Sequence, residues 1–253
     1  MDLKGFNSKS RFSSRAKNYN KYRPSYPSEV ISFLTEAIGL NKCSFIADIG
    51  SGTGISTRIF LDNGNTVYSV EPNEDMRQIA ERLLNGYSNF YSVAGSSEST
   101  NLQSESIDVI VAAQSFHWFD LIPTKNEFLR ILKPNGFIVL LYNIRRNNSV
   151  GFMGEYLSLI KKYGEKYINE SDDDFTSDFF ADKTVYEKVL HNPQIVDFEG
   201  LKGNLVSYSY MPNEDDPNFI TMISELRNLF NKYNKDGKVI LEYDTCISYC
   251  KMK

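Results

Sequence analysis

The chain has 253 residues, of which 41% are hydrophobic and 13% aromatic, and its formal net charge is −4. This length and composition suffice to bury a full core, and they favour one α/β domain with an elaboration over two independent domains. The negative charge argues against a broad nucleic-acid surface, and no apolar run approaches the ~20 residues that a bilayer-spanning helix needs.

Cysteine use and the polar start point to a cytoplasmic protein without a metal centre. Cys43, Cys246 and Cys250 are an odd, sparse set, and the chain has only two histidines, so we expect reduced thiols and no metal site. The first residues contain no apolar segment of the kind that directs secretion. We expect a cytoplasmic protein that does not bind membranes.

Helix and strand signals alternate from residue 28 to residue 143. An amphipathic run opens after Pro27 and stops at Gly39, which predicts a helix. Strand signals follow at 45–49, 66–71, 90–94, 107–113 and 137–142, and helical spacing separates them at 55–61, 76–84 and 124–132. Five strands joined by helices predict a doubly wound, mainly parallel sheet, whose ligand binds at the carboxyl ends of the strands.

The remainder of the chain is harder to interpret. Residues 152–160 have helical apolar spacing, and an acidic run at 170–174 is typical of a solvated surface, so we interpret 144–191 as a helical cap inserted after the fifth strand. We expect the sheet to resume at 194–198, followed by a helix from about 217 to 233 and a final strand at 239–249. Ser207, Tyr208 and Tyr210 are candidates for contacts with a substrate under this cap.

The segment Asp48-Ile49-Gly50-Ser51-Gly52-Thr53-Gly54 lies between the first predicted strand and the helix that follows it. Glycines in such a loop permit a tight turn, close approach of a ligand to the backbone, and close packing of helix on strand. Glu71 ends the next strand, 23 positions after Asp48, close to the ~20-residue spacing at which a carboxylate meets ribose hydroxyls. The segment predicts an adenosine-bearing ligand; a glycine-rich turn without a ligand is the alternative.

The details of this loop disfavour a nicotinamide dinucleotide. The fingerprint G-x-G-x-x-G would place its third glycine one position later, where the chain has Ile55. A Tyr-x-x-x-Lys pair, which short-chain dehydrogenases need, occurs only as Tyr249 and Lys253 at the end of the sequence.

Other predicted strand ends carry further candidates. Pro72 and Met76 follow Glu71 and could form an apolar wall for adenine, while Ser96 and Ser97 follow the third strand and could meet the adenine edge. Ser96 as an ordinary turn residue is the alternative. After the fourth strand comes Gln114-Ser115-Phe116-His117-Trp118-Phe119-Asp120, which contains the only tryptophan. This aromatic cluster indicates either core packing or the wall of a reaction centre, with His117 as a general base, a pocket wall or a support.

The glycine segment resembles motif I of the class I S-adenosylmethionine (SAM) methyltransferases. The stretches at 19–27 and 114–120 are similar to those of small-molecule methyltransferases of the trans-aconitate methyltransferase-like group, and the resemblance covers about residues 15–143. It implies a Rossmann-like fold with a seven-stranded sheet whose last strand is antiparallel. It also implies four segments: an arm over the cofactor (1–27), a SAM-binding core (28–143), a helical cap (144–191) and the rest of the core (192–253).

Site roles follow from the same resemblance. Tyr19 and Arg23 would contact the methionine carboxylate, although Arg23 could equally be a surface charge. Glu71 would bind ribose. The methionine end of SAM would be held by Asp48, Gly50, Ser51, Gly52 and Thr53, and Gln114, His117 and Trp118 would border the reaction centre.

The expected activity is methyl transfer by in-line displacement to a small-molecule acceptor, at a carboxyl or hydroxyl oxygen. A SAM-binding module without transfer activity is the first alternative. A nucleic-acid methyltransferase is disfavoured because the acidic chain lacks the Asn/Asp-Pro-Pro-aromatic motif that holds an amino group. The sequence predicts neither the individual acceptor nor the oligomeric state.

Overall fold

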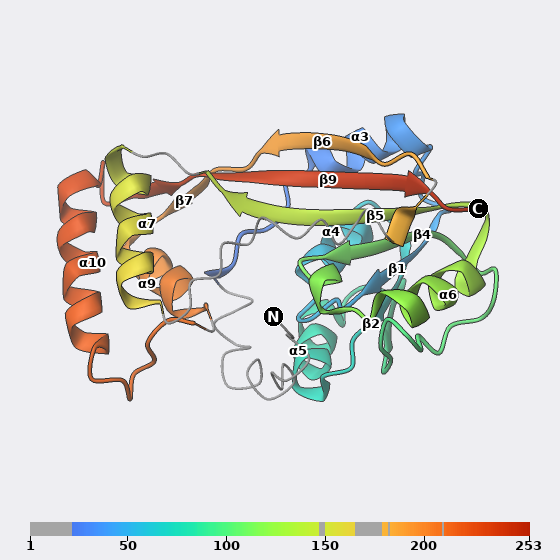
Figure 1. The fold of residues 1–253 in the computed structure, drawn as a ribbon, viewed down its shortest axis with the longest axis horizontal. Helices are drawn as coiled ribbons and strands as arrows, with labels where there is room; N and C mark the ends of the chain where they lie inside the picture. The colour runs from blue at the N-terminus through green and yellow to red at the C-terminus, as the bar shows by residue number, and fades with distance from the viewer. Residues whose placement is uncertain (1–21, 147–149, 165–178, 182, 209) are drawn as a thin grey trace. The chain divides into compact units, whose positions relative to one another are not determined.

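The computed structural model describes residues 22–146, 150–164, 179–181, 183–208 and 210–253, and the structural statements below refer to these residues. They fall into two compact units. The core unit comprises the described parts of Ser25–Asn143, Asp173–Leu190 and Thr245–Lys253, and the second unit comprises those of Met1–Pro24, Ile144–Asp172 and His191–Asp244. Figure 1 labels elements of both units.

A seven-stranded sheet organises the core unit, in the order β3-β2-β1-β4-β5-β9-β6. Its strands are β1 (Phe45–Ile49), β2 (Thr66–Val70), β3 (Phe90–Val93), β4 (Ile107–Ala113), β5 (Leu132–Arg145), β6 (Tyr186–His191) and β9 (Tyr243–Lys251). The first five strands pair in parallel, and β9, the last strand, runs antiparallel to them (Figure 1). The predicted doubly wound, mainly parallel sheet with an antiparallel last strand is confirmed.

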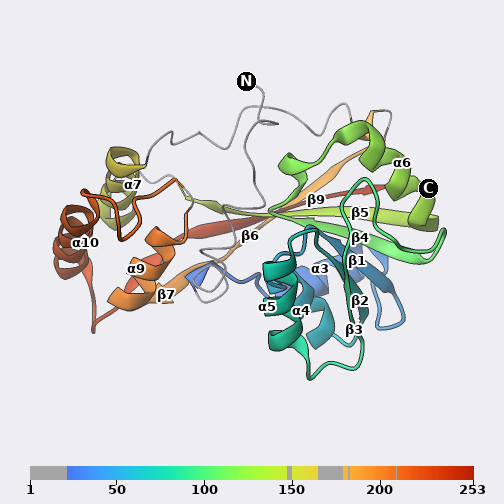
Figure 2. The same cartoon turned by 90° about the horizontal axis from the view of Figure 1, so that it is seen from below.

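Both faces of this sheet are covered because its strands are apolar on both sides. Ile46 and Val67 belong to a buried cluster with the helices α3 (Glu29–Ile38), α4 (Ile55–Asp62) and α5 (Glu74–Leu84). Ala47 and Ile49, which alternate with Ile46 along β1, belong to a second cluster with α6 (Leu121–Ile131). Figure 2 shows α6 on the opposite side of the sheet from α4 and α5. Burial on both faces is the usual state of a parallel sheet.

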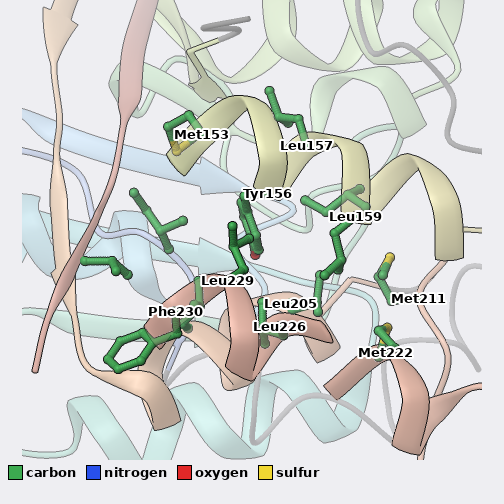
Figure 3. Packing of buried hydrophobic residues seen from close by; sticks show 14 of the residues in the cluster. Met153, Tyr156, Leu157, Leu159, Leu205, Met211, Met222, Leu226, Leu229 and Phe230 are labelled. Carbon is green, nitrogen blue, oxygen red and sulfur yellow. The ribbon is translucent and has the colours of Figure 1, made fainter. Parts of the chain in front are cut away.

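The second unit is built on the helices α7 (Gly151–Tyr163), α9 (Phe198–Val206) and α10 (Phe219–Tyr233). Their apolar sides meet in one buried cluster, in which Tyr156, Leu205 and Leu226 are fully enclosed (Figure 3). Tyr22, at the start of the described chain, packs on α9, since a Cβ atom at Gly203 would lie 2.3 Å from its ring. Among the helices described, none combines the length and hydropathy that crossing a membrane requires.

Three details differ from the sequence-based expectations. The strand expected at 194–198 does not extend the main sheet. Among the described strands, β7 (Gln194–Val196) pairs only with β8 (Val239–Leu241), in the antiparallel sense, and Asp197 then caps α9. The final strand expected at 239–249 is two strands, β8 and β9, separated at Glu242. The segment expected to be a helical cap contains the edge strand β6, whose exposed, partly charged side chains lack the apolar alternation typical of strands.

The division into an arm, a core, a cap and a remainder stays a prediction. The structure groups residues 191–244 with the described part of 144–172, and it groups 245–253 with the sheet.

Candidate functional site

The loop between β1 and α4 has the backbone geometry that its glycines permit. Gly50 and Gly54 have φ values of 68° and 85°, in the left-handed region that side chains disfavour. A Cβ atom at Gly50 would lie 2.7 Å from Ser115 Cβ, and one at Gly54 would lie 2.7 Å from Leu84 Cδ1. The first glycine therefore allows the end of β4 to approach the loop, and the last allows α5 to pack against it.

Asp48 lies beneath this loop with its side chain wholly buried. Ser56 Oγ and Thr57 Oγ1, at the start of α4, each donate to Asp48 Oδ2 at 2.7 Å. Its other oxygen, Oδ1, is buried and accepts no hydrogen bond within the described part of the chain. Burial, aided by the negative charge of Glu71, raises the pKa of Asp48 to about 6 against the lowering effect of the hydrogen bonds from Thr57 and Ser56. A buried carboxylate with one unsatisfied oxygen is suited to a cationic or hydrogen-bond-donating ligand.

Glu71, directly after β2, connects the neighbouring strand end to the loop. Its Oε2 atom accepts from the backbone N–H of Gly52 at 3.0 Å, and its Oε1 atom accepts from the N–H of Asn73 at 2.8 Å. These two contacts fix the direction of the Glu71 carboxylate at the edge of the glycine loop. Asn73 caps α5 by accepting from the N–H of Met76 at 3.1 Å, which places the buried Met76 beside the loop, and Pro72 is exposed at the same turn.

The turn after β3 is tied to the segment after β4. Ser96 N–H donates to Ser99 O at 3.0 Å, and Ser97 Oγ donates to Glu98 Oε1 at 2.7 Å. The same Glu98 oxygen accepts from the N–H of Asp120 at 3.2 Å. Ser96 and Ser97 are therefore positioned in a turn that is held against residues 115–120.

The segment after β4 divides into core and exposed positions. Phe116 is 2% exposed and packs edge-on against Phe179, with ring centroids 4.9 Å apart. His117 is exposed and Trp118 is 44% exposed, with their rings 4.8 Å apart. Core packing, one of the two interpretations of this cluster, therefore applies to Phe116 and not to His117 or Trp118.

Gln114 begins this segment in a strained conformation. Its φ of 56° is unusual for a residue with a side chain, and its Nε2 donates to Asn143 O at 3.0 Å. Asn143 in turn accepts from Thr245 Oγ1 at 2.6 Å and donates to Ser25 O at 3.3 Å. Next in the chain, Ser115 Oγ donates to Ile49 O at 2.8 Å, which fixes the segment beside the glycine loop.

The structure thus brings the predicted residues Asp48 to Thr53, Glu71, Pro72 and Met76 together, with Gln114 adjoining the loop through Ser115. Arg23 lies in the second unit, where its Nη2 donates to Ser207 O at 3.4 Å, and Tyr19 is outside the described residues. Sequence reasoning missed Ser56, Thr57 and Asn143. The pair of hydroxyl residues directly after the loop was a usable signal for the first two, whereas nothing local indicated Asn143.

Comparison with known proteins agrees with this geometry. Residues 47–140 match the profile of a family described as a methyltransferase domain. An uncharacterised methyltransferase of Schizosaccharomyces pombe is 30% identical over 146 residues, covering 57% of this chain and 57% of the relative. An uncharacterised methyltransferase of Mycobacterium bovis is 30% identical over 154 residues, 61% of this chain and 60% of its own. The chain therefore spans less than two thirds of the length of these curated relatives.

A solved structure shows the same fold. A protein from Anaeromyxobacter dehalogenans, provisionally described as a type II methyltransferase, superposes with a TM-score of 0.67 over 90% of this chain and 97% of its own, at 18% identity. The two proteins thus share a Rossmann-like fold.

Proposed function

We propose that this chain, whose residues 47–140 match the profile of a methyltransferase domain, binds SAM and transfers its methyl group to an oxygen atom of a small molecule. The proposal includes the predicted similarity to the trans-aconitate methyltransferase-like group. The observation that carries it is the buried Asp48, whose Oδ1 is unsatisfied beneath a glycine loop held by the carboxylate of Glu71.

The charge of this site fits SAM better than a dinucleotide. SAM carries a sulfonium and an ammonium group, and Asp48 and Glu71 are two buried carboxylates whose mutual repulsion contributes to the raised pKa of Asp48. A cationic ligand relieves that repulsion. A pyrophosphate would add to it, and the nearby cations are already engaged: Arg58 is 68% exposed and pairs with Asp62, and Arg77 Nη1 donates to Glu71 O at 2.9 Å.

The proposed roles of the residues follow their positions. Asp48 and the loop Gly50, Ser51, Gly52 and Thr53 would hold the methionine end of SAM, and Glu71 would accept from the ribose hydroxyls. Met76, with Pro72, would contact the adenine face, and Ser96 and Ser97 the adenine edge. Gln114, His117 and Trp118 would border the transferred methyl group, while Tyr19 and Arg23 stay candidates for the methionine carboxylate.

Bound SAM supplies a methyl group that its sulfonium already activates, so the protein mainly aligns the acceptor and excludes water. For a hydroxyl acceptor, the exposed imidazole of His117 would take the proton from the acceptor oxygen. A carboxylate acceptor has no proton to lose and would need only alignment. The exposure of His117 beside Trp118 supports the proposal of either a basic or a positioning role.

A transfer assay with methyl-labelled SAM tests this proposal. The acceptors are panels of small carboxylic acids, alcohols and amines, with transfer RNA and duplex DNA as separate arms. We expect labelled esters or ethers of small molecules, in amounts that fall in a Glu71→Ala variant. Saturable SAM binding without label transfer to any acceptor would favour a SAM-binding module, and label recovered only in nucleic acid would contradict the small-molecule assignment.

A further inference from the structure

Ser69 is a buried serine in an otherwise apolar part of β2. Val67 and Val70 of the same strand are fully buried, and Ser69 is 3% exposed. In the parallel register Ser69 stands opposite Asp48 of β1. A buried hydroxyl costs free energy unless it forms hydrogen bonds, and an apolar side chain in a buried parallel strand avoids that cost. The serine therefore points to a role other than packing.

The hydroxyl of Ser69 is bonded to the side chain of the glycine loop. Ser69 Oγ donates to Ser51 Oγ at 2.7 Å, and Ser51 is itself buried. On its other side, Ser69 Oγ lies 3.5 Å from Thr57 Oγ1, the hydroxyl that donates to Asp48 Oδ2 at 2.7 Å. Ser69 thus lies between the loop and the hydroxyl that holds the Asp48 carboxylate.

The backbone of the loop makes this bond consequential. Ser51 lies between Gly50 and Gly52, whose φ values are 68° and 57°. Glycine loses more conformational freedom on ordering than any other residue, so a loop with glycine on both sides of Ser51 is costly to order. The N–H of Ser51 donates to Val70 O at 3.2 Å, a longer bond than the one between the two hydroxyls. The side-chain bond from Ser69 therefore adds a second, shorter constraint on Ser51.

We propose that Ser69 is a positioning residue of the SAM site, which orders the glycine loop for the methionine end of SAM through its hydrogen bond to Ser51. This role rests on the proposed function, which assigns the methionine end to Ser51 and its neighbours. A loop that is ordered before binding loses less conformational entropy when SAM binds, so the bond raises the affinity.

The effect of Ser69 is expected to be confined to the methionine end. Glu71, the proposed ribose ligand, keeps its hydrogen bond from Asn73 N–H at 2.8 Å, and that bond does not involve the loop. The turn with Ser96 and Ser97, the proposed adenine contacts, follows β3. Loss of the Ser69 hydroxyl therefore leaves the contacts to the nucleoside in place.

Two ligands separate the methionine end from the rest of SAM. S-adenosylhomocysteine keeps the amino-acid end, whereas 5′-methylthioadenosine keeps the nucleoside and the thioether but lacks that end. Both ligands and SAM are titrated calorimetrically into wild type and Ser69→Ala. Because one neutral hydrogen bond is lost, we expect the Kd values of SAM and S-adenosylhomocysteine to rise about fivefold, and that of 5′-methylthioadenosine to change by less than about twofold.

Ser44→Ala is the matched control. Ser44 is a buried serine just before β1, at the end of that strand away from the loop, and its Oγ accepts from Asn41 N–H at 3.2 Å. All three ligands should bind Ser44→Ala as they bind wild type. A double-mutant cycle tests the route through Ser51: in a Ser51→Ala background, Ser69→Ala should have no further effect on the Kd for SAM.

A Kd for SAM that is equal in wild type and Ser69→Ala would overturn the inference. An equal loss of affinity for 5′-methylthioadenosine would also overturn it, since the whole site would then be disturbed. If Ser69→Ala does not fold, judged by circular dichroism, Ser51→Ala removes the same bond from the other side and decides by the same pattern. Failure of wild type to bind SAM would refute the proposed function itself, whereas intact SAM binding without the Ser69 effect refutes the positioning role alone.

Discussion

The carboxylate of Glu71 accepts a hydrogen bond from the backbone N–H of Gly52 at 3.0 Å, and so joins the end of β2 to the glycine loop after β1. The same carboxylate accepts from Asn73 N–H at the start of α5. One side chain therefore orders three segments of the proposed SAM site. Its substitution is expected to affect both the loop and ribose binding.

Glu71→Gln removes this charge while keeping the size of the side chain. We expect the Kd for SAM to rise about 10- to 100-fold, because hydrogen bonds to a charged group contribute about 1.5–3 kcal/mol. Glu74→Gln is the control, since Glu74 is an exposed residue nearby whose carboxylate accepts from Gln78 Nε2. Calorimetric titration measures both, and equal affinities in the two variants would contradict the assigned role of Glu71.

Asp48→Asn is expected to stabilise the protein while weakening SAM binding. Because burial raises the pKa of Asp48 from 3.8 to about 6, the folded state binds the proton more tightly than the unfolded state, and Asp48 lowers stability as pH rises from about 4 to about 6. The difference corresponds to at most about 3 kcal/mol at pH 7. In the variant, a neutral amide replaces the carboxylate whose Oδ1 is unsatisfied.

Urea unfolding of wild type and Asp48→Asn across pH 4 to 8 measures this effect. The stability advantage of the variant should be small near pH 4, grow to about pH 6 and then level off. An advantage that shrinks with rising pH would show that Asp48 is instead stabilised as a carboxylate in the folded protein.

Gly50→Ala should destabilise the protein through both strain and a clash. The left-handed backbone costs a side chain about 1–2 kcal/mol, and overpacking against Ser115 adds about 1–3 kcal/mol. Gly39→Ala is the matched control, because Gly39 has a φ of 72° but no atom within 4 Å of an added Cβ. The excess cost of Gly50→Ala should fall when Ser115→Gly is added in a double-mutant cycle. If Gly39→Ala and Gly50→Ala lowered the free energy of unfolding equally, a clash with Ser115 would be contradicted.

Trp118 provides a spectroscopic test of its position. It is the only tryptophan of the chain and is 44% exposed, so its emission reports on one place. Saturating SAM should change that emission, whereas NADH at the same concentration should not. Trp118→Ala should cost less than about 1 kcal/mol of stability, against about 3–5 kcal/mol for Phe116→Ala in the core. An emission unchanged by bound SAM would place Trp118 away from the site.

The parts of the fold and of the candidate site that could be predicted from the sequence are those determined by residues close together in the chain. The loop from Asp48 to Gly54 and the strand ending before Glu71 are contiguous patterns, so their positions follow from strand, turn and helix rules. The hydrogen bond between Asn143 and Thr245 could not be predicted, because the two residues are 102 positions apart and the pairing of strands in the sheet brings them together.

The most direct measurement of the central claim is calorimetric titration of the purified chain and its Glu71→Ala variant with SAM and, separately, with NADH. The account predicts saturable binding of SAM to the wild type, binding at least tenfold weaker to the variant, and no binding of NADH. Binding of NADH, or of neither ligand, to the wild type would contradict the assignment of the Gly50 to Gly54 loop to SAM.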